Sequence, residues 1–88
     1  MTITTAKPAA VIRDGALRAT IWKNRGEKGD FHSIRFTRTW NDEQGNWHDT
    51  DSFSGTDLLI VGRLAVRAYD AIAELRAADR AEREAAAT

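Results

Sequence analysis

A short segment near residue 20 alternates apolar residues with residues that can bind a planar, charged ligand. In order, its residues are Leu17, Arg18, Ala19, Thr20, Ile21 and Trp22. Side chains alternate across a β-strand, so one face of this segment would be buried and the other would carry a guanidinium group and an indole ring. Unpaired nucleic acid binds such surfaces, because bases stack on aromatic rings and cations pair with phosphates. The segment therefore predicts a stacking platform with positive charge beside it.

The predicted nucleic-acid-binding site extends over neighbouring segments and combines basic with aromatic residues. Its members are Arg18, Thr20, Trp22, Lys23, Lys28, Phe31, Arg35 and Trp47. Base stacking contributes about 1–3 kcal/mol per base, and each phosphate contact steepens the salt dependence of single-strand binding by about 0.7 in log–log slope. We therefore expect binding that tolerates any base sequence and weakens with salt. The alternative for the basic residues is a solvated face on which arginine pairs with Asp49 or Asp51 and contributes little.

The aromatic residues also have ordinary structural interpretations. Trp22 can equally well pack under a loop or in a dimer contact. Phe31 is expected opposite Trp22, where the two rings would form a cross-strand pair that stabilises the sheet without any ligand. Trp40 and Trp47 flank the second predicted hairpin, and we expect them to clasp each other across it.

The net charge of zero conceals an uneven distribution. Residues 1–40 contain eight basic and three acidic side chains, whereas residues 41–56 contain four acids and no lysine or arginine. Residues 57–88 contain five arginines and six acids. The local field matters more for anion binding than the total charge does. The predicted strand region is therefore basic enough to attract nucleic acid.

No set of residues predicts a catalytic centre. The chain has no cysteine, which excludes disulfides, thiolate metal sites and cysteine nucleophiles. His32, His48, Asp49 and Asp51 form no compact metal-binding motif, and His48 and Asp49 would point to opposite faces of one strand. The serines lie in no nucleophile motif. We expect a protein that is not an enzyme, with no metal, cofactor or small-molecule substrate.

Four antiparallel strands are predicted in the first two thirds of the chain. Period-two alternation, with β-branched and aromatic residues, indicates strands at 11–12, 16–24, 30–40 and 47–54. Turn residues separate them, at Asp14-Gly15, around the glycines at 26 and 29, and over 41–46. A meander is the simplest connection of such strands.

One long helix is predicted after Phe53, where the hydrophobic period changes from two to about 3.6. Ser54 with Asp57 three residues later resembles a capping box, which indicates the helix start. The main apolar stripe comprises Leu58, Val61, Ala65, Ala68, Ile72 and Leu75. Further apolar residues widen this stripe beyond what one contact needs. Among them, Ile60, Leu64 and Tyr69 are expected to contact a second copy of the chain.

Length and composition predict a single domain. A chain of 88 residues has a modest core, which a dimer would extend. Residues 1–8 are expected to form a flexible arm and residues 9–76 a ββββα domain. Residues 77–88 are alanine-rich and bury little, so we expect a helical tail that frays. No signal peptide or apolar run of about 20 residues is present, which predicts a soluble, cytoplasmic protein with no membrane contact.

Element order and hairpin composition resemble those of a known family. The segment GALRATIW at 15–22 leads to a second strand over 31–37, and WNDEQGNW at 40–47 forms the next hairpin. Over about residues 10–76 the chain resembles the small bacterial relatives of the transcriptional positive cofactor and Whirly proteins, which bind single-stranded DNA. The resemblance implies dimers formed through the helices and curved sheets that present basic and aromatic residues. By that resemblance the nucleic acid would contact Arg18, Trp22, Lys23, Phe31, Arg35 and Trp47.

The sequence thus predicts an α+β fold, with a four-stranded antiparallel β-meander followed by one long C-terminal α-helix and paired as a homodimer. We expect it to bind single-stranded DNA, in preference to RNA, as an accessory in transcription, replication or repair. The alternative is a small protein-interaction module, such as a phage- or plasmid-encoded inhibitor or adaptor. The neutral total charge and the acidic fourth strand fit that alternative.

Overall fold

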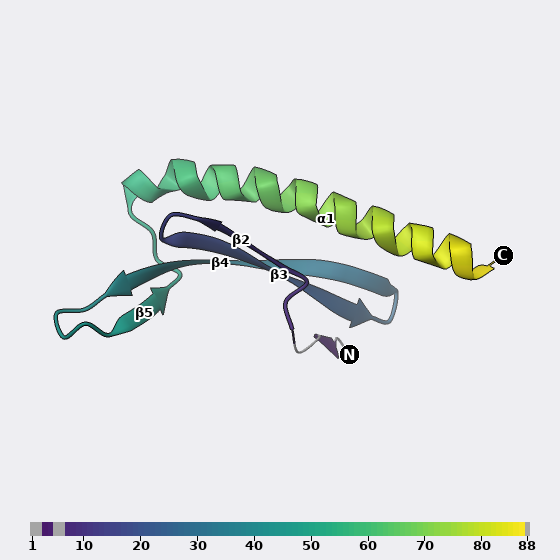
Figure 1. Ribbon diagram of the computed structural model, residues 1–88, viewed down its shortest axis with the longest axis horizontal. Coiled ribbons are helices and arrows are strands. Elements are labelled where there is room, and N and C mark those ends of the chain that lie inside the picture. Colours follow the sequence, from purple (N-terminus) through teal and green to yellow (C-terminus); the bar gives the residue numbers. More distant parts are fainter. Residues whose placement is uncertain (1–2, 5–6, 88) are drawn as a thin grey trace.

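The computed structural model describes residues 3–4 and 7–87, and it shows one antiparallel sheet with one helix across it (Figure 1). The elements are β1 (Ile3–Thr4), β2 (Ala10–Asp14), β3 (Leu17–Gly26), β4 (Gly29–Asn41), β5 (Trp47–Thr50), the 3₁₀ turn η1 (Gly55–Asp57) and α1 (Leu58–Ala87). The predicted α+β fold with a single C-terminal helix is confirmed. The fourth predicted strand, 47–54, is shorter in the structure and ends at Thr50.

Strand β3 is the central strand of the sheet. It pairs with β4 along its whole length and with β2 over its first half. The last four residues of β4, 38–41, pair with β5. These consecutive pairings form the predicted meander. The two residues of β1 extend the β2 edge by pairing with Asn24 and Arg25. The predicted arm of residues 1–8 lies partly outside the described residues.

Short turns connect the strands, and the longest of them is organised by Asp42. The β3–β4 hairpin closes over Glu27 and Lys28, and Gly29 adopts a φ of 123° that other residues rarely tolerate. In the β4–β5 turn, the Asp42 carboxylate bonds the His48 imidazole at 2.7 Å and accepts the backbone N–H of Asn46 at 2.9 Å. These bonds, the one from His48 first, lower the pKa of Asp42 below its usual range.

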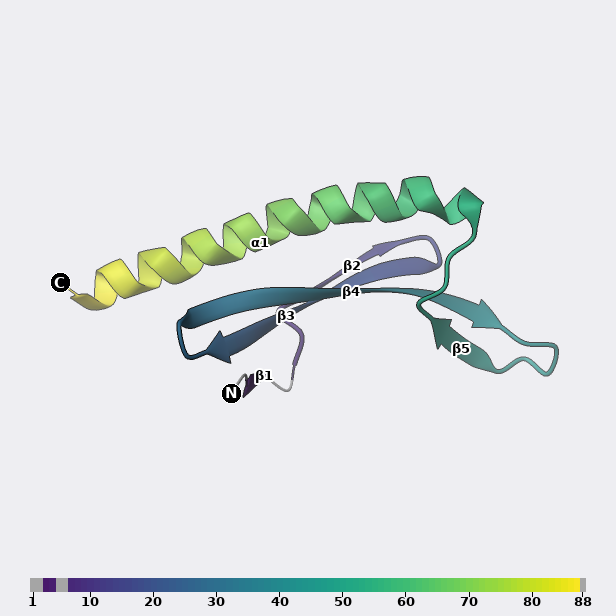
Figure 2. The same ribbon diagram turned by 180° about the vertical axis from the view of Figure 1, so that it is seen from behind.

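The helix begins where the capping residues predict. The backbone N–H of Ser54 donates to the Asp57 carboxylate at 2.9 Å, which lowers the pKa of that carboxyl group. One turn of 3₁₀ helix leads into α1. The helix then continues to Ala87 and passes over the sheet toward the β3–β4 hairpin (Figures 1 and 2). Within the described chain, no helix is long and apolar enough to cross a membrane.

The core between α1 and the sheet is small. Among the described residues, the buried apolar side chains are Leu17, Ala19, Ile21, Leu64 and Ala68. Partly buried residues of β2, β4 and α1, together with Phe53, pack around them. Two members of the predicted helix stripe are exposed instead, since α1 turns Leu58 and Ala65 away from the sheet. Because α1 covers this face of β3, the opposite face, which we call the outer face, carries the residues at 18, 20 and 22.

Candidate nucleic-acid interface

A shallow hollow of about 210 Å³ lies on the outer face of the sheet. The residues that line it are Arg18, Thr20, Trp22, Arg35, Thr37 and Asp49. Strand pairing explains the assembly, because Thr20 faces Arg35 and Arg18 faces Thr37 across the β3–β4 ladder. Four of the eight predicted site residues therefore meet in one place, at positions 18, 20, 22 and 35. The tertiary structure adds Thr37 and Asp49 to them.

The two arginines of the hollow differ in their partners. Arg18 Nη2 donates to Asp49 Oδ2 at 2.5 Å, and both side chains are partly exposed. This pair is the structural alternative that the sequence predicted for the arginines. Arg35 is exposed and makes no hydrogen bond or ion pair within residues 7–87. Arg35 is thus the cation of the hollow that is available to a phosphate, and Arg18 is balanced by a carboxylate.

Two buried polar residues of the outer face, Thr37 in the hollow and Asn24 outside it, were not predicted from the sequence. Thr37 is 6% exposed, and its hydroxyl has no hydrogen-bond partner in the described structure. Further along β3 on the same face, outside the hollow, Asn24 is 3% exposed, and its amide donates to the Ser33 hydroxyl at 2.9 Å. Strand alternation after Arg35 was the signal that could have identified Thr37. Thr37 thus adds to the lining of the hollow a buried hydroxyl that has no partner among the described residues.

The two predicted lysines lie away from the hollow. Lys23 projects from the face of the sheet that α1 covers, where its ammonium group contacts Asp79 at 2.8 Å and Asp30 at 3.6 Å. The hydrogen bond to Asp79 raises the pKa of Lys23. The prediction that Lys23 shares a surface with Trp22 is therefore wrong, because the two residues are adjacent on one strand and point to opposite faces. Lys28 lies in the β3–β4 turn and is exposed.

The aromatic residues do not form the pairs expected of them. Ser33 faces Trp22 across the ladder, so Phe31, which is 46% exposed, occupies the diagonal position on the same outer face. Trp40 and Trp47 point to opposite faces and do not clasp each other, because Trp40 pairs with His48. The rings of Trp40 and His48 stack with centroids 4.5 Å apart.

Trp47 is the most exposed tryptophan, at 69%. It is the first residue of β5 and lies on the outer face, opposite Asn41. Asp49, which lines the hollow, lies two residues further along on the same face of β5. Phe31 and Trp47 therefore extend the outer face in two directions from the hollow without lining it.

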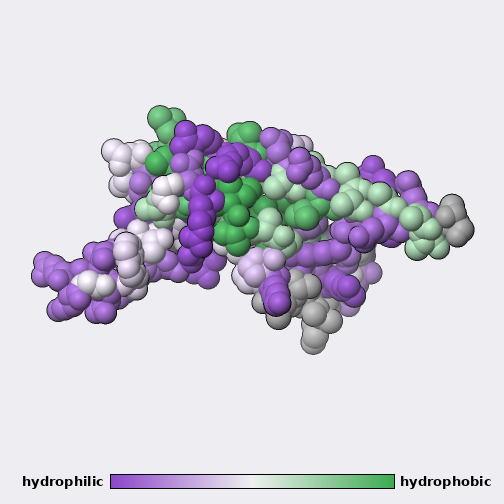
Figure 3. Space-filling view, in the orientation of Figure 1, coloured by the Kyte–Doolittle hydropathy of each residue, from purple (hydrophilic) through white to green (hydrophobic). Residues whose placement is uncertain are grey.

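The residues predicted to contact a second copy have different positions on α1. Leu64 is fully buried in the core of its own chain, and Ile60 packs partly buried against that core. Both were expected at a dimer contact, and for Leu64 that expectation is wrong. Tyr69 is 75% exposed, and it shares the outward side of α1 with Leu59 and Val66, at 88% and 64% exposure. Figure 3 shows apolar atoms along the outer edge of the first half of α1.

Among the described residues, the two histidines, Asp49 and Asp51 do not assemble a metal site. His32 and His48 lie on the same face as Trp40, whereas Asp49 lies on the outer face. Within the described residues, no group of three or more metal-binding side chains comes together.

No protein-family model, curated protein or solved structure matches this chain.

Proposed function

We propose that the outer face binds single-stranded nucleic acid, with DNA as the expected form. The observation that carries this proposal is the hollow in which Trp22 and Arg35 lie on one face, with Thr20 and the unpaired Thr37 hydroxyl beside them. An unpaired strand supplies bases to stack on the ring and phosphates for the guanidinium group. A duplex keeps its base faces stacked inside, so it offers such a surface its backbone and its groove edges but no free ring face.

The chemistry of the hollow favours sequence-tolerant binding. Every base has a π-face, so stacking on Trp22 does not depend on base identity. Phe31 and Trp47 provide further exposed rings on the same face, along which a strand can continue in both directions. Such a module suits an accessory role in transcription, replication or repair, where unpaired strands arise transiently.

The direct test is an anisotropy titration of a fluorescein-labelled thymidine oligonucleotide with the protein at low and moderate salt. We expect saturable binding that falls with salt by about 0.7 in log–log slope for each phosphate contacted. A duplex of the same length is expected to bind more weakly, and an RNA of the same length compares the two backbones. Equal binding of duplex and single strand, or no binding at low salt, would contradict the proposal.

An Asp49→Asn variant sharpens this titration. Asp49 neutralises Arg18 at 2.5 Å, so its loss frees a second guanidinium group in the hollow. We expect tighter oligonucleotide binding and a salt slope steeper by about 0.7, the increment of one added phosphate contact. Asp51→Asn, which removes the same charge outside the hollow, is the matched control. Identical gains in the two variants would mean that net charge alone, and not the freed Arg18, controls binding.

We further propose that a second copy of the chain covers the outward side of α1. Leu59, Gly62, Val66, Tyr69 and Ala73 recur there at alternating spacings of three and four, the pattern of a helix–helix contact. The chain's own core is small, and a second copy would remove Leu59, Val66 and Tyr69 from water.

Sedimentation equilibrium tests the dimer. We expect a mass twice the 9.8 kDa of the chain, and we expect a Val66→Glu variant to sediment as a monomer because it places a charge in the contact. Glu74→Gln, a change beside the stripe, serves as the control and should remain dimeric. A wild-type protein that is monomeric at all concentrations would refute this arrangement.

A protein-interaction module is the second candidate function. The exposed apolar side of α1 and the Arg18–Asp49 pair favour it, since the first can bind a foreign protein and the second weakens an anion site. The two functions give different results in the same titration. A protein-binding module should show no salt-dependent oligonucleotide binding, whereas a nucleic-acid binder should prefer the unpaired strand.

A further inference from the structure

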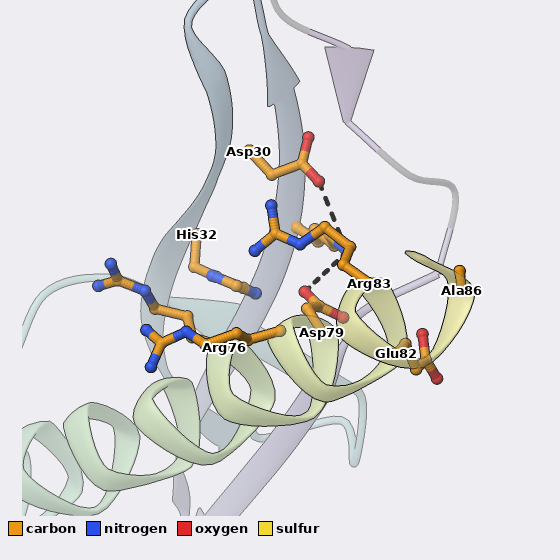
Figure 4. A pocket seen from close by; sticks show the side chains of 9 residues that line it. Asp30, His32, Arg76, Asp79, Glu82, Arg83 and Ala86 are labelled. Atoms are coloured by element: carbon orange, nitrogen blue, oxygen red, sulfur yellow. Dashed lines mark hydrogen bonds and ion pairs between the residues drawn. The ribbon is translucent and has the colours of Figure 1, made fainter. Parts of the chain in front are cut away.

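A second cleft, of about 360 Å³, lies on the opposite side of the sheet, between the last turns of α1 and the β3–β4 hairpin. The residues that line it are Lys23, Asp30, His32, Arg76, Asp79, Arg80, Glu82, Arg83 and Ala86. Figure 4 shows the His32 ring between the side chains of Arg76 and Arg83, with Asp79 on the helix beside them. The cleft is separate from the hollow that contains Trp22.

The chemistry of α1 changes at this cleft. Up to Leu75 the helix packs apolar side chains on the sheet, and beyond that residue it presents arginines and acids to the hairpin. The sheet changes at the same level, because Ile21 and Ile34 give way to Lys23 and His32 along the two strands. The last turns of α1 therefore face a polar cleft and do not pack on the apolar core.

Positive charge in the cleft is only partly balanced. Asp30 and Asp79 both pair with Lys23, and Asp79 also interacts electrostatically with Arg83 and His32. Arg76, Arg80 and Arg83 form no hydrogen bond or ion pair within residues 7–87. Glu82 is the one remaining acid among the lining residues. Three guanidinium groups without a hydrogen bond or ion pair to the described residues thus line the cavity, and its positive side chains outnumber its acids.

His32 places a buried polar atom without a partner beside these arginines. Its Nε2 atom is buried and has no hydrogen-bond partner in the described structure. A buried polar atom without a partner is costly, and such atoms are few in folded proteins. A ligand oxygen in the cleft would satisfy Nε2 together with the neighbouring guanidinium groups, whose long side chains can rotate to admit it.

We propose that this cleft binds a phosphate group, with Arg76, Arg83 and His32 as its principal ligands. Guanidinium groups match phosphate oxygens in geometry and form paired, charge-assisted hydrogen bonds with them. The cleft contains no aromatic side chain other than His32, so it recognises the phosphate and not a base. The phosphate can belong to a free oligophosphate or to a nucleic acid backbone that continues around the β3–β4 hairpin. The proposal does not depend on nucleic acid binding at the outer face.

The test is calorimetric titration of the full chain with inorganic pyrophosphate, with sulfate as the anion control. We expect saturable pyrophosphate binding that an Arg76→Gln/Arg83→Gln variant weakens at least tenfold. Arg63→Gln/Arg67→Gln carries the same charge change on the same helix outside the cleft and should bind normally. Glutamine favours helix, and circular dichroism confirms that each variant is folded. A His32→Phe variant, which keeps an aromatic ring but loses the imidazole nitrogens, should also bind pyrophosphate more weakly.

The two phosphate sources give different outcomes. Loss of pyrophosphate binding in the cleft variant alone supports a free oligophosphate as ligand. If pyrophosphate does not bind, but the cleft variant binds a thymidine oligonucleotide more weakly than the control variant does, the backbone is the source. If the cleft and control variants behave alike with both probes, the phosphate site is refuted. Pyrophosphate binding without oligonucleotide binding would refute the outer-face function and leave this site in place.

Discussion

A Trp22→Ala variant is expected to bind an unpaired thymidine oligonucleotide about 5- to 150-fold more weakly than the wild-type protein, from the roughly 1–3 kcal/mol that one stacked base contributes. Trp22 supplies the ring of the hollow, and no other aromatic residue lines it. The loss should appear at every salt concentration with an unchanged salt slope, because stacking involves no phosphate neutralisation. Anisotropy titrations at low and moderate salt measure both quantities.

Two further tryptophan substitutions make this result specific. Trp22→Phe keeps a ring for stacking and should retain most of the affinity. Trp40→Ala removes a tryptophan that stacks on His48 on the other face, so it should leave oligonucleotide binding unchanged. If Trp40→Ala weakens binding as much as Trp22→Ala does, the hollow is not the site. Circular dichroism establishes that each variant keeps its sheet and helix.

A Leu64→Ala variant is expected to lower the free energy of unfolding by about 2–5 kcal/mol, the range for removing a buried leucine side chain. Leu64 is fully buried and is one of only two large side chains so completely enclosed in the described core, the other being Ile21. Small domains have little stability to lose, and one leucine is a large part of this core. Chemical denaturation followed by circular dichroism measures the change.

Leu59→Ala is the matched control, because it makes the same substitution on the same helix at a side chain that is 88% exposed. In a monomer its cost should be within about 0.5 kcal/mol. If Leu59 contacts a second copy, its cost should appear only at protein concentrations at which the dimer forms. Denaturation at two concentrations a hundredfold apart separates these cases. Equal losses for Leu64→Ala and Leu59→Ala at both concentrations would contradict the assignment of Leu64 to the core.

The elements of the fold were predictable because their signals are local. The alternation at 17–22 sets two faces within one strand, whatever the rest of the chain does. Ser54 and Asp57 are three residues apart, and their cap forms as the sequence predicts. For the same reason, the grouping of Arg18, Thr20 and Trp22 on one surface followed from the sequence alone.

Strand pairing and packing decided which residues from different elements meet. The β4–β5 register places His48 opposite Trp40, so the two tryptophans that flank the hairpin separate to opposite faces. The position of α1 decided that Leu64 fills the core while Leu59 and Tyr69 remain exposed, since the helix is apolar on more than one side. It also placed Lys23 beside Asp79, 56 residues further along the chain.

The sequence by itself thus determined the strands, the helix start and the residues that share a face within one strand. Only the tertiary structure decided that Arg35 and Thr37 complete the hollow around Trp22 and that the arginines of the helix tail surround His32. The physical reason is the range of each interaction. Side-chain alternation and capping act between residues a few positions apart, whereas register and the covered face of a sheet depend on contacts between distant segments.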